Sequence, residues 1–268
     1  MNVVLFVEGS NDLRLNGRNG DSLTRLWNDH LCGAAGIQPF SAVYGISKQQ
    51  LVGMNPRAAG LSGMAPGFDV ELARRLSADQ SVEAAVVAWD LHPKWNPTGT
   101  YCRWSETLML YRGLAASTAL PSEWAAAAQI RLNELSARGL PSDRPSPPSL
   151  ERNTVLPLCM EHMFESLLAS SEAAVRRALG VDGLTVKDWP SWRVHEHDPA
   201  RRLVEPAIEC LFRMRPKPRL VSHVGGGFVT HKNDWNELIV REVLSGPDSA
   251  RIVDHPFIKR LGEIGARR

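Results

Sequence analysis

The chain has 268 residues, of which 43% are hydrophobic and 22% are charged, so it can bury a full core and has the composition of an ordinary globular protein. Its formal net charge is only +2, from 31 Lys and Arg against 29 Asp and Glu, which excludes binding to nucleic acid through overall charge alone. Any surface that binds nucleic acid must therefore be local.

The cysteines and the apolar segments limit the class of protein further. No Cys-x-x-Cys spacing occurs, so neither a zinc knuckle nor a disulfide framework is indicated. Glu8 and Asp12 fall where the apolar part of a signal peptide would have to continue, and no stretch approaches the length of a transmembrane helix. We therefore expect a cytoplasmic protein with no membrane partner.

The first predicted element is a strand over residues 3–8, an apolar run of β-branched and aromatic residues that ends abruptly at Glu8 and Gly9. A polar loop that contains Asp12 follows, and apolar residues at helical spacing then predict a helix over residues 21–31. Open α/β folds place their chemistry at the carboxyl edge of the sheet. We expect the strand to present the Glu8 carboxylate at that edge.

Two further strands are predicted in the first half of the chain. Alternating residues at 40–46 indicate one, and an apolar run at 84–90, which ends in Asp90, indicates the other. A helix is predicted between them over residues 69–76. This order of strands and helices predicts right-handed crossovers and a mostly parallel sheet. Glu8 and Asp90 would then stand side by side at strand ends, an arrangement that usually holds a divalent metal.

The second half of the chain is predicted to be mainly helical. Residues 92–99 include two prolines and are expected to form a loop, and a stretch rich in proline and serine at residues 141–149 is a candidate boundary of an insertion. A last strand is predicted over residues 153–159, with a helix over residues 161–170 after it. The remaining predicted helices cover residues 104–119, 122–138, 172–179, 199–213, 234–244 and 256–265.

Three stretches resemble known families. The sequence Val7-Glu8-Gly9-Ser10-Asn11-Asp12, followed by a strand that ends in an Asp, resembles the TOPRIM domain, the metal-dependent catalytic module of topoisomerases, primases and OLD-family nucleases. Residues 156–169, with the core Phe164-Glu165-x-x-Leu168, are similar to a segment of the DUF4276 group of stand-alone TOPRIM-like proteins. The tail at residues 254–261 also resembles that group.

The resemblance implies an α/β fold with a TOPRIM-like, mostly parallel sheet that is flanked by helices and carries helical additions. The TOPRIM-like core would occupy residues 1–170, with a helical insertion at about residues 100–150. Residues 171–268 would form a helical C-terminal extension packed on that core.

The resemblance also implies an activity, that of a divalent-metal-dependent nuclease on DNA or RNA which acts as the effector of a bacterial anti-phage defence system. Glu8, Asp90 and Glu165 would hold Mg²⁺ or Mn²⁺, and Asp12 would support a second ion or bind a metal-bound water. The ion would polarise the scissile phosphate and generate hydroxide from water.

The second motif departs from the TOPRIM pattern, which has Asp-x-Asp where this chain has Asp90-Leu91-His92. Imidazole is a poor ligand for magnesium but an acceptable one for manganese. The metal preference could have shifted, His92 could carry protons, or the activity could be lost. A catalytically silent TOPRIM-like subunit that binds nucleic acid or a partner is therefore the alternative function.

Lys94, two residues beyond His92, is a further candidate because a lysine can stabilise the charge that develops on a phosphoryl oxygen. An exposed loop lysine is more often simply solvated. Glu161 stands at helical spacing from Glu165, and whether it takes part is left open.

The most basic stretch of the chain is where contacts with phosphates are expected. Trp189 and Trp192 could stack bases, although a basic run is usually a solvated surface. The candidate nucleic-acid-binding residues are Arg213, Arg215, Lys217 and Arg219.

Two other patterns are interpreted as structural. His195-Glu196-His197-Asp198 looks like a metal cluster, but no further ligand pattern accompanies it. Gly225-Gly226-Gly227 lacks the Gly-Lys-Ser/Thr ending of a phosphate-binding loop and is expected to be a flexible turn.

Stand-alone TOPRIM proteins of this kind resemble the nuclease subunits of systems in which an ABC-type or AAA-type ATPase controls the nuclease. No Walker A motif occurs in the sequence, so the chain cannot supply nucleotide switching alone. The resemblance therefore implies an ATPase partner, for which the absent motif is only indirect support, and a homo-oligomer is left open.

Overall fold

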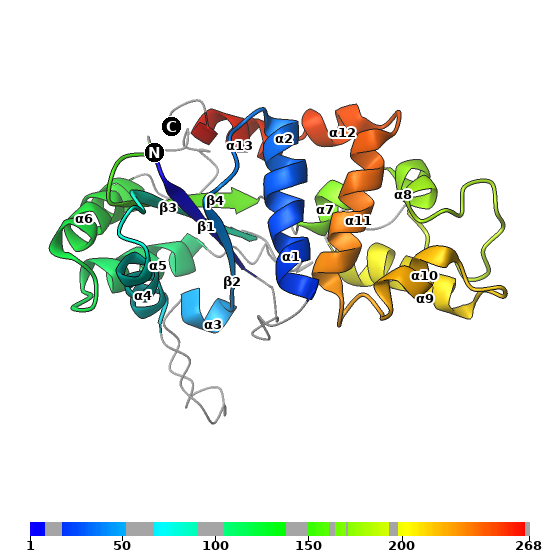
Figure 1. Cartoon of the computed structure of the whole chain (residues 1–268), viewed down its shortest axis with the longest axis horizontal. Coiled ribbons are helices and arrows are strands. Elements are labelled where there is room, and N and C mark those ends of the chain that lie inside the picture. The colour runs from blue at the N-terminus through cyan, green and yellow to red at the C-terminus, as the bar shows by residue number, and fades with distance from the viewer. Residues whose placement is uncertain are drawn as a thin grey trace, which may run out of the picture.

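A computed structural model describes residues 1–8, 18–51, 67–90, 104–137, 150–160, 164–169, 171–192 and 198–265 of the chain. Four parallel strands form its sheet, in the order β2-β1-β3-β4 (Figure 1). They are β1 (Val3–Glu8), β2 (Ala42–Ile46), β3 (Ala84–Asp90) and β4 (Thr154–Met160). The predicted α/β class with a parallel sheet is confirmed. Because every neighbouring pair is parallel, the carboxyl ends of all four strands meet at one edge.

Helices make up most of the rest of the described chain. Before β4 they are α1 (Arg18–Thr24), η1 (Arg25–Leu31), α2 (Cys32–Ala35), α3 (Lys48–Leu51), α4 (Phe68–Ala78), α5 (Trp104–Ala115) and α6 (Ser122–Ala137). After β4 they are α7 (Glu165–Leu168), α8 (Glu172–Ala178), η2 (Ala200–Val204), α9 (Glu205–Arg213), α10 (Arg219–Val224), α11 (Lys232–Ser245), α12 (Ser249–Val253) and α13 (Pro256–Gly265).

Both faces of the sheet are covered by helices (Figure 1). On one face, Val4 and Phe6 share a core with α4, α5 and α6. On the other face, Val3 and Leu5 share a core with α1, η1, α8, α9, α11 and α13. Central strands that are buried on both faces need a continuous apolar sequence, which is why β1 and β3 were readable as strands. The helices that follow β4 complete the core that the sheet begins.

Several helix boundaries differ from the predictions. The helix predicted over residues 21–31 belongs to a longer run, in which α1, η1 and α2 follow one another without a break and η1 is π-helical. This run ends at Gly36, whose left-handed backbone (φ +67°) suits a residue without a side chain. The helix predicted from residue 234 begins at Lys232. Among the described helices, none is long and apolar enough to cross a membrane.

Candidate functional site

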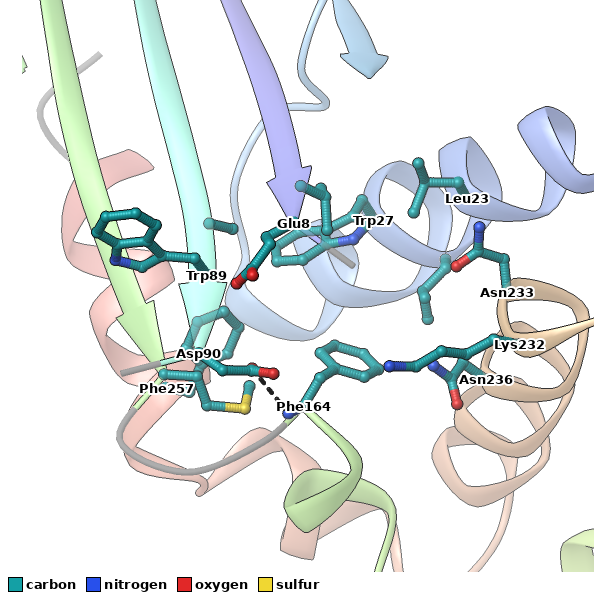
Figure 2. A pocket seen from close by; sticks show the side chains of 14 residues that line it. Glu8, Leu23, Trp27, Trp89, Asp90, Phe164, Lys232, Asn233, Asn236 and Phe257 are labelled. Carbon is teal, nitrogen blue, oxygen red and sulfur yellow. Dashed lines mark hydrogen bonds between the residues drawn. The ribbon is translucent and has the colours of Figure 1, made fainter. Parts of the chain in front are cut away.

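The site begins at the ends of two neighbouring strands. Glu8 is the last residue of β1, Asp90 is the last residue of β3, and the two strands pair with Val7 opposite Ala88. Because side chains alternate along a strand, a regular sheet would send Glu8 and Asp90 to opposite faces. Both nevertheless line one pocket, because the pocket lies just beyond the carboxyl edge (Figure 2).

Asp90 is held by a backbone group that follows β4 in the chain. The Phe164 amide donates a hydrogen bond to Asp90 Oδ1 over 3.0 Å (Figure 2). Burial and the negative charges of Glu165 and Glu8 raise the pKa of Asp90 to about 7, although the charge of Lys232 opposes them. Negative charge is therefore concentrated at this edge of the sheet, and a nearby cation would be stabilised there.

Glu165 and Lys232 form an ion pair beside Asp90. Glu165 opens α7 and has no exposed surface, and Lys232 opens α11. The Lys232 ammonium lies 2.7 Å from Glu165 Oε1. Burial alone would lower the pKa of Lys232, but the carboxylates of Glu165 and Asp90 outweigh it and raise the pKa. The two carboxylates therefore favour the charged form of Lys232.

The pocket is small and has an apolar wall. Its cavity volume is about 40 Å³, and a water molecule needs roughly 10–15 Å³, so a few waters or an ion fit but a nucleotide does not. Asn233 and Asn236 line it beside Lys232. A wall poor in polar groups strengthens the electrostatic interactions inside it. The apolar lining residues are Val7, Leu23, Leu26, Trp27, Ala88, Trp89, Met160, Phe164 and Phe257.

Carboxylate oxygens are the donors that Mg²⁺ and Mn²⁺ prefer, so Glu8 and Asp90 fit part of a divalent-metal site. Within the part of the chain that the structure describes, Glu165 Oε2 is buried without a hydrogen-bond partner, which leaves one more oxygen available. However, no three His, Cys, Asp or Glu side chains among the described residues gather closely enough to hold a metal. Further His, Cys, Asp or Glu ligands would have to come from outside them, where Asp12 and His92 lie.

The structure brings together three of the residues expected from the sequence, Glu8, Asp90 and Glu165. Their assignment to a metal stays a prediction. The remaining candidates of this site, Asp12, His92 and Lys94, fall outside the described residues, as do Glu161 and the stretch 193–197.

Sequence reasoning missed Lys232. It follows a glycine-rich turn and opens a helix, where a lysine is usually solvated, and the helix was expected to start two residues later. Its side chain reaches Glu165, which is distant in the sequence, and no local pattern signals that contact.

The basic stretch lies elsewhere. Arg213 ends α9, Arg219 opens α10, and Arg215 and Lys217 lie between them, all exposed and none of them lining the pocket. Arg213 lies 3.5 Å from Glu209 and 3.8 Å from Asp188 in exposed ion pairs. Their role in binding nucleic acid stays a prediction.

Trp189 and Trp192 are engaged in packing. Their rings stack on each other with centroids 6.0 Å apart, and the Arg176 guanidinium lies 4.7 Å from the Trp189 ring. Trp192 Nε1 donates to the Ala169 carbonyl over 3.1 Å. These contacts occupy ring surface that a base would need, which weakens the suggestion that the two rings stack bases.

The fold and the site define an α/β protein with a carboxylate–lysine cluster at the carboxyl edge of a parallel sheet. Comparisons with protein-family models, with curated proteins and with solved structures find no match.

Proposed function

We propose that this chain is a divalent-metal-dependent phosphodiesterase that cleaves DNA or RNA. The observation that carries the proposal is one small cavity lined by Glu8, Asp90 and Lys232, with Glu165 paired to the Lys232 ammonium. Carboxylates that bind a metal and a lysine that binds a phosphate oxygen are what phosphodiester hydrolysis requires.

In this proposal Glu8 and Asp90 would hold the ion, together with Asp12 or His92. When bound, the ion polarises the scissile phosphate and activates a water molecule. Lys232 binds a non-bridging phosphate oxygen and stabilises the charge that develops on it. Glu165 keeps the Lys232 ammonium in place, because their 2.7 Å contact fixes the end of a flexible side chain. The Phe164 amide holds Asp90 in a single orientation.

Cleavage assays on plasmid DNA and structured RNA, with Mg²⁺, Mn²⁺ or EDTA, test the proposal. We expect metal-dependent cleavage that Glu8→Gln and Asp90→Asn abolish, and that Lys232→Ala slows by about 100-fold or more. Glu123→Gln, which changes an exposed carboxylate on α6, is the matched control and should cleave like the wild type. Equal cleavage by wild type and Glu8→Gln would contradict the proposal.

The second candidate is a catalytically silent subunit that binds nucleic acid or a partner. It is favoured by the ion pair, because Lys232 already neutralises Glu165, the carboxylate deepest in the site. Titration calorimetry with Mn²⁺ separates the two functions. Metal binding that Glu8→Gln removes supports the nuclease, whereas no binding together with no cleavage supports the silent subunit.

We also propose that an ABC-type or AAA-type ATPase controls the nuclease in a cytoplasmic anti-phage system. The support is the lack of a Walker A motif in this sequence and its low net charge of +2, which suit shared recognition of nucleic acid. A pull-down from the native host, followed by mass spectrometry, tests it. Recovery of the chain alone, as a monomer or homo-oligomer with nuclease activity, would contradict the partner.

A further inference from the structure

Residues at the start of α11 line two different cavities. Lys232 and Asn233 line the small pocket with Glu8 and Asp90, whereas the neighbouring His231 and Asp234 line a second, larger cavity of about 680 Å³. The polar residues of this second cavity are not used by the proposed reaction. Their contacts converge on the helix turn that carries Lys232.

Asp234 links this turn to α1 and to His231. Its Oδ1 accepts a hydrogen bond from the Ser22 hydroxyl, and its Oδ2 lies 3.0 Å from His231 Nδ1. Arg25 Nη2 in turn donates to the Ser22 hydroxyl oxygen over 3.0 Å. One carboxylate therefore connects two segments that are more than two hundred residues apart in the sequence.

Two of the three glycines before α11, Gly226 and Gly227, contact the same arrangement. The His231 ring lies so close to Gly226 that a Cβ there would be 2.1 Å from its Cδ2 atom, so a side chain at this position would displace the ring. The Gly226 carbonyl accepts a hydrogen bond from Trp235 Nε1 over 2.9 Å, and the His231 amide donates to the Gly227 carbonyl over 3.1 Å. Two hydrogen bonds therefore join this turn to the first turn of α11.

We infer that Ser22, Gly226, His231 and Asp234 form a latch that positions Lys232. The inference rests on the proposed function, in which Lys232 is a catalytic residue and the four latch residues are positioning residues. A helix start leaves unpaired amides and frays unless it is capped. His231, the residue before α11, makes no side-chain capping bond, and the bonds of Asp234 tie this first turn to α1 and to His231 instead. Without it, the first turn and the Lys232 ammonium would lose their fixed place against Glu165.

The latch can be opened without removing the core. The side chains of His231 and Asp234 are 33% and 16% exposed and belong to the wall of the wide cavity, so smaller residues there leave the apolar packing intact. His231→Ala, Asp234→Ala and Gly226→Ala are therefore suitable variants. His231→Asn keeps a donor near the position of Nδ1 and is the conservative replacement. Glu242→Gln, at an exposed ion pair near the other end of α11, is the matched control.

The reactivity of the Lys232 amine tests the latch without any activity assay. Acetic anhydride labelling, followed by peptide mass spectrometry, measures how often the ammonium leaves Glu165. We expect the labelling rate at Lys232 to rise about five- to tenfold in His231→Ala, Asp234→Ala and Gly226→Ala, as the loss of one hydrogen-bonded tie predicts. His231→Asn and Glu242→Gln should label like the wild type. Unchanged labelling in all three opening variants would overturn the latch.

Cleavage kinetics then test whether the latch residues affect the proposed reaction. Misplacement of a catalytic group by about 1 Å can lower the rate by about 100-fold, so we expect kcat to fall by about 10- to 100-fold with KM unchanged, and His231→Asn to restore it. If the labelling rises but the wild type never cleaves, the latch stands and the proposed function fails. If cleavage is metal-dependent but the opening variants keep the wild-type kcat, the proposed function stands and the latch is refuted. Should Asp234→Ala fail to fold, His231→Ala and its His231→Asn partner give the same comparison.

Discussion

The Glu165 carboxylate is fully buried, and the Lys232 ammonium lies 2.7 Å from one of its oxygens. Taking an ion pair out of water costs about as much as the attraction returns, so the pair adds little net stability. Removal of one partner is different, because the other charge is left in the interior. The exposure of the two partners is unequal: the Lys232 side chain is 32% exposed and that of Glu165 is 0%.

We therefore expect an asymmetric response to substitution. Lys232→Met should lower the free energy of unfolding by about 3 kcal/mol, because Glu165 then has no counter-charge. Glu165→Gln should cost less, since the negative charge of Asp90 still faces the Lys232 ammonium. The double variant should lose less free energy of unfolding than the two single variants lose together. Urea denaturation of the three variants measures this, and additive losses would show that the two side chains do not interact.

Asp90 predicts a pH dependence in the metal-free protein. Its pKa in the folded state is about 7, because of burial and of the negative charges of Glu165 and Glu8, whereas an unfolded Asp has a pKa of about 3.9. The folded state therefore binds the proton more tightly. The contribution of this group to stability is fully present below about pH 4 and is lost as the pH rises through about 7.

The measurement is the free energy of unfolding in EDTA at pH 5 and at pH 8. We expect the wild type to lose more stability between the two pH values than Asp90→Asn, which has no proton to release. An identical loss in both proteins would mean that Asp90 titrates normally in the folded state.

At the scale of secondary-structure elements, the strands were predictable and the helix contacts were not. A central strand buried on both faces must be apolar throughout, so the apolar runs of β1 and β3 predict these strands from the sequence. The acid that ends each run marks the carboxyl edge of the sheet. Glu165 was singled out through a resemblance, and its burial followed from no local pattern. Lys232 shows why the helix contacts could not be predicted from the sequence. Its surroundings come from β3, α7 and α1, which only the folded chain brings together.

The contact between α13 and α2 depends on a glycine. A Cβ at Gly265 would lie 1.9 Å from Ile37 Cγ2, just after α2. Gly265→Ala should therefore lower the free energy of unfolding by about 1–3 kcal/mol, since a tight contact would have to open.

Gly33→Ala is the opposite case, because its new methyl group meets nothing within 4 Å on an exposed helix position. It should raise stability by about 0.5–1 kcal/mol, through the higher helix propensity of alanine. Thermal or urea unfolding of Gly265→Ala and Gly33→Ala beside the wild type measures both changes in stability. A more stable Gly265→Ala would contradict the close contact with Ile37.

At the scale of the whole molecule, positive and negative charges nearly cancel, but exposed basic residues gather between α9 and α10. The net charge of +2 gives little general attraction to nucleic acid, and the small pocket accepts no more than a few waters or an ion. Apart from the scissile phosphate, which Lys232 contacts in the proposed mechanism, a long polyanion would have to be held outside the pocket. The exposed basic residues between α9 and α10 are the proposed place. In Figure 1, α9 and α10 lie at the lower right, whereas α12 and α13 lie along the top.

Salt dependence of binding tests this placement. Each lost phosphate contact lowers the slope of log K against log salt by about 1, so Arg215→Gln combined with Lys217→Gln should lower it by about 2 and weaken binding to all sequences alike. Arg251→Gln combined with Lys259→Gln removes the same charge from α12 and α13, where both side chains form exposed ion pairs, and should leave the slope unchanged. Fluorescence anisotropy with a labelled oligonucleotide, from low to physiological salt, measures both doubles beside the wild type. Equal slopes for the two doubles would place the phosphate contacts elsewhere on the surface. Because the Glu8→Gln background prevents cleavage in the proposed mechanism, binding can be measured there with Mg²⁺ present and independently of turnover.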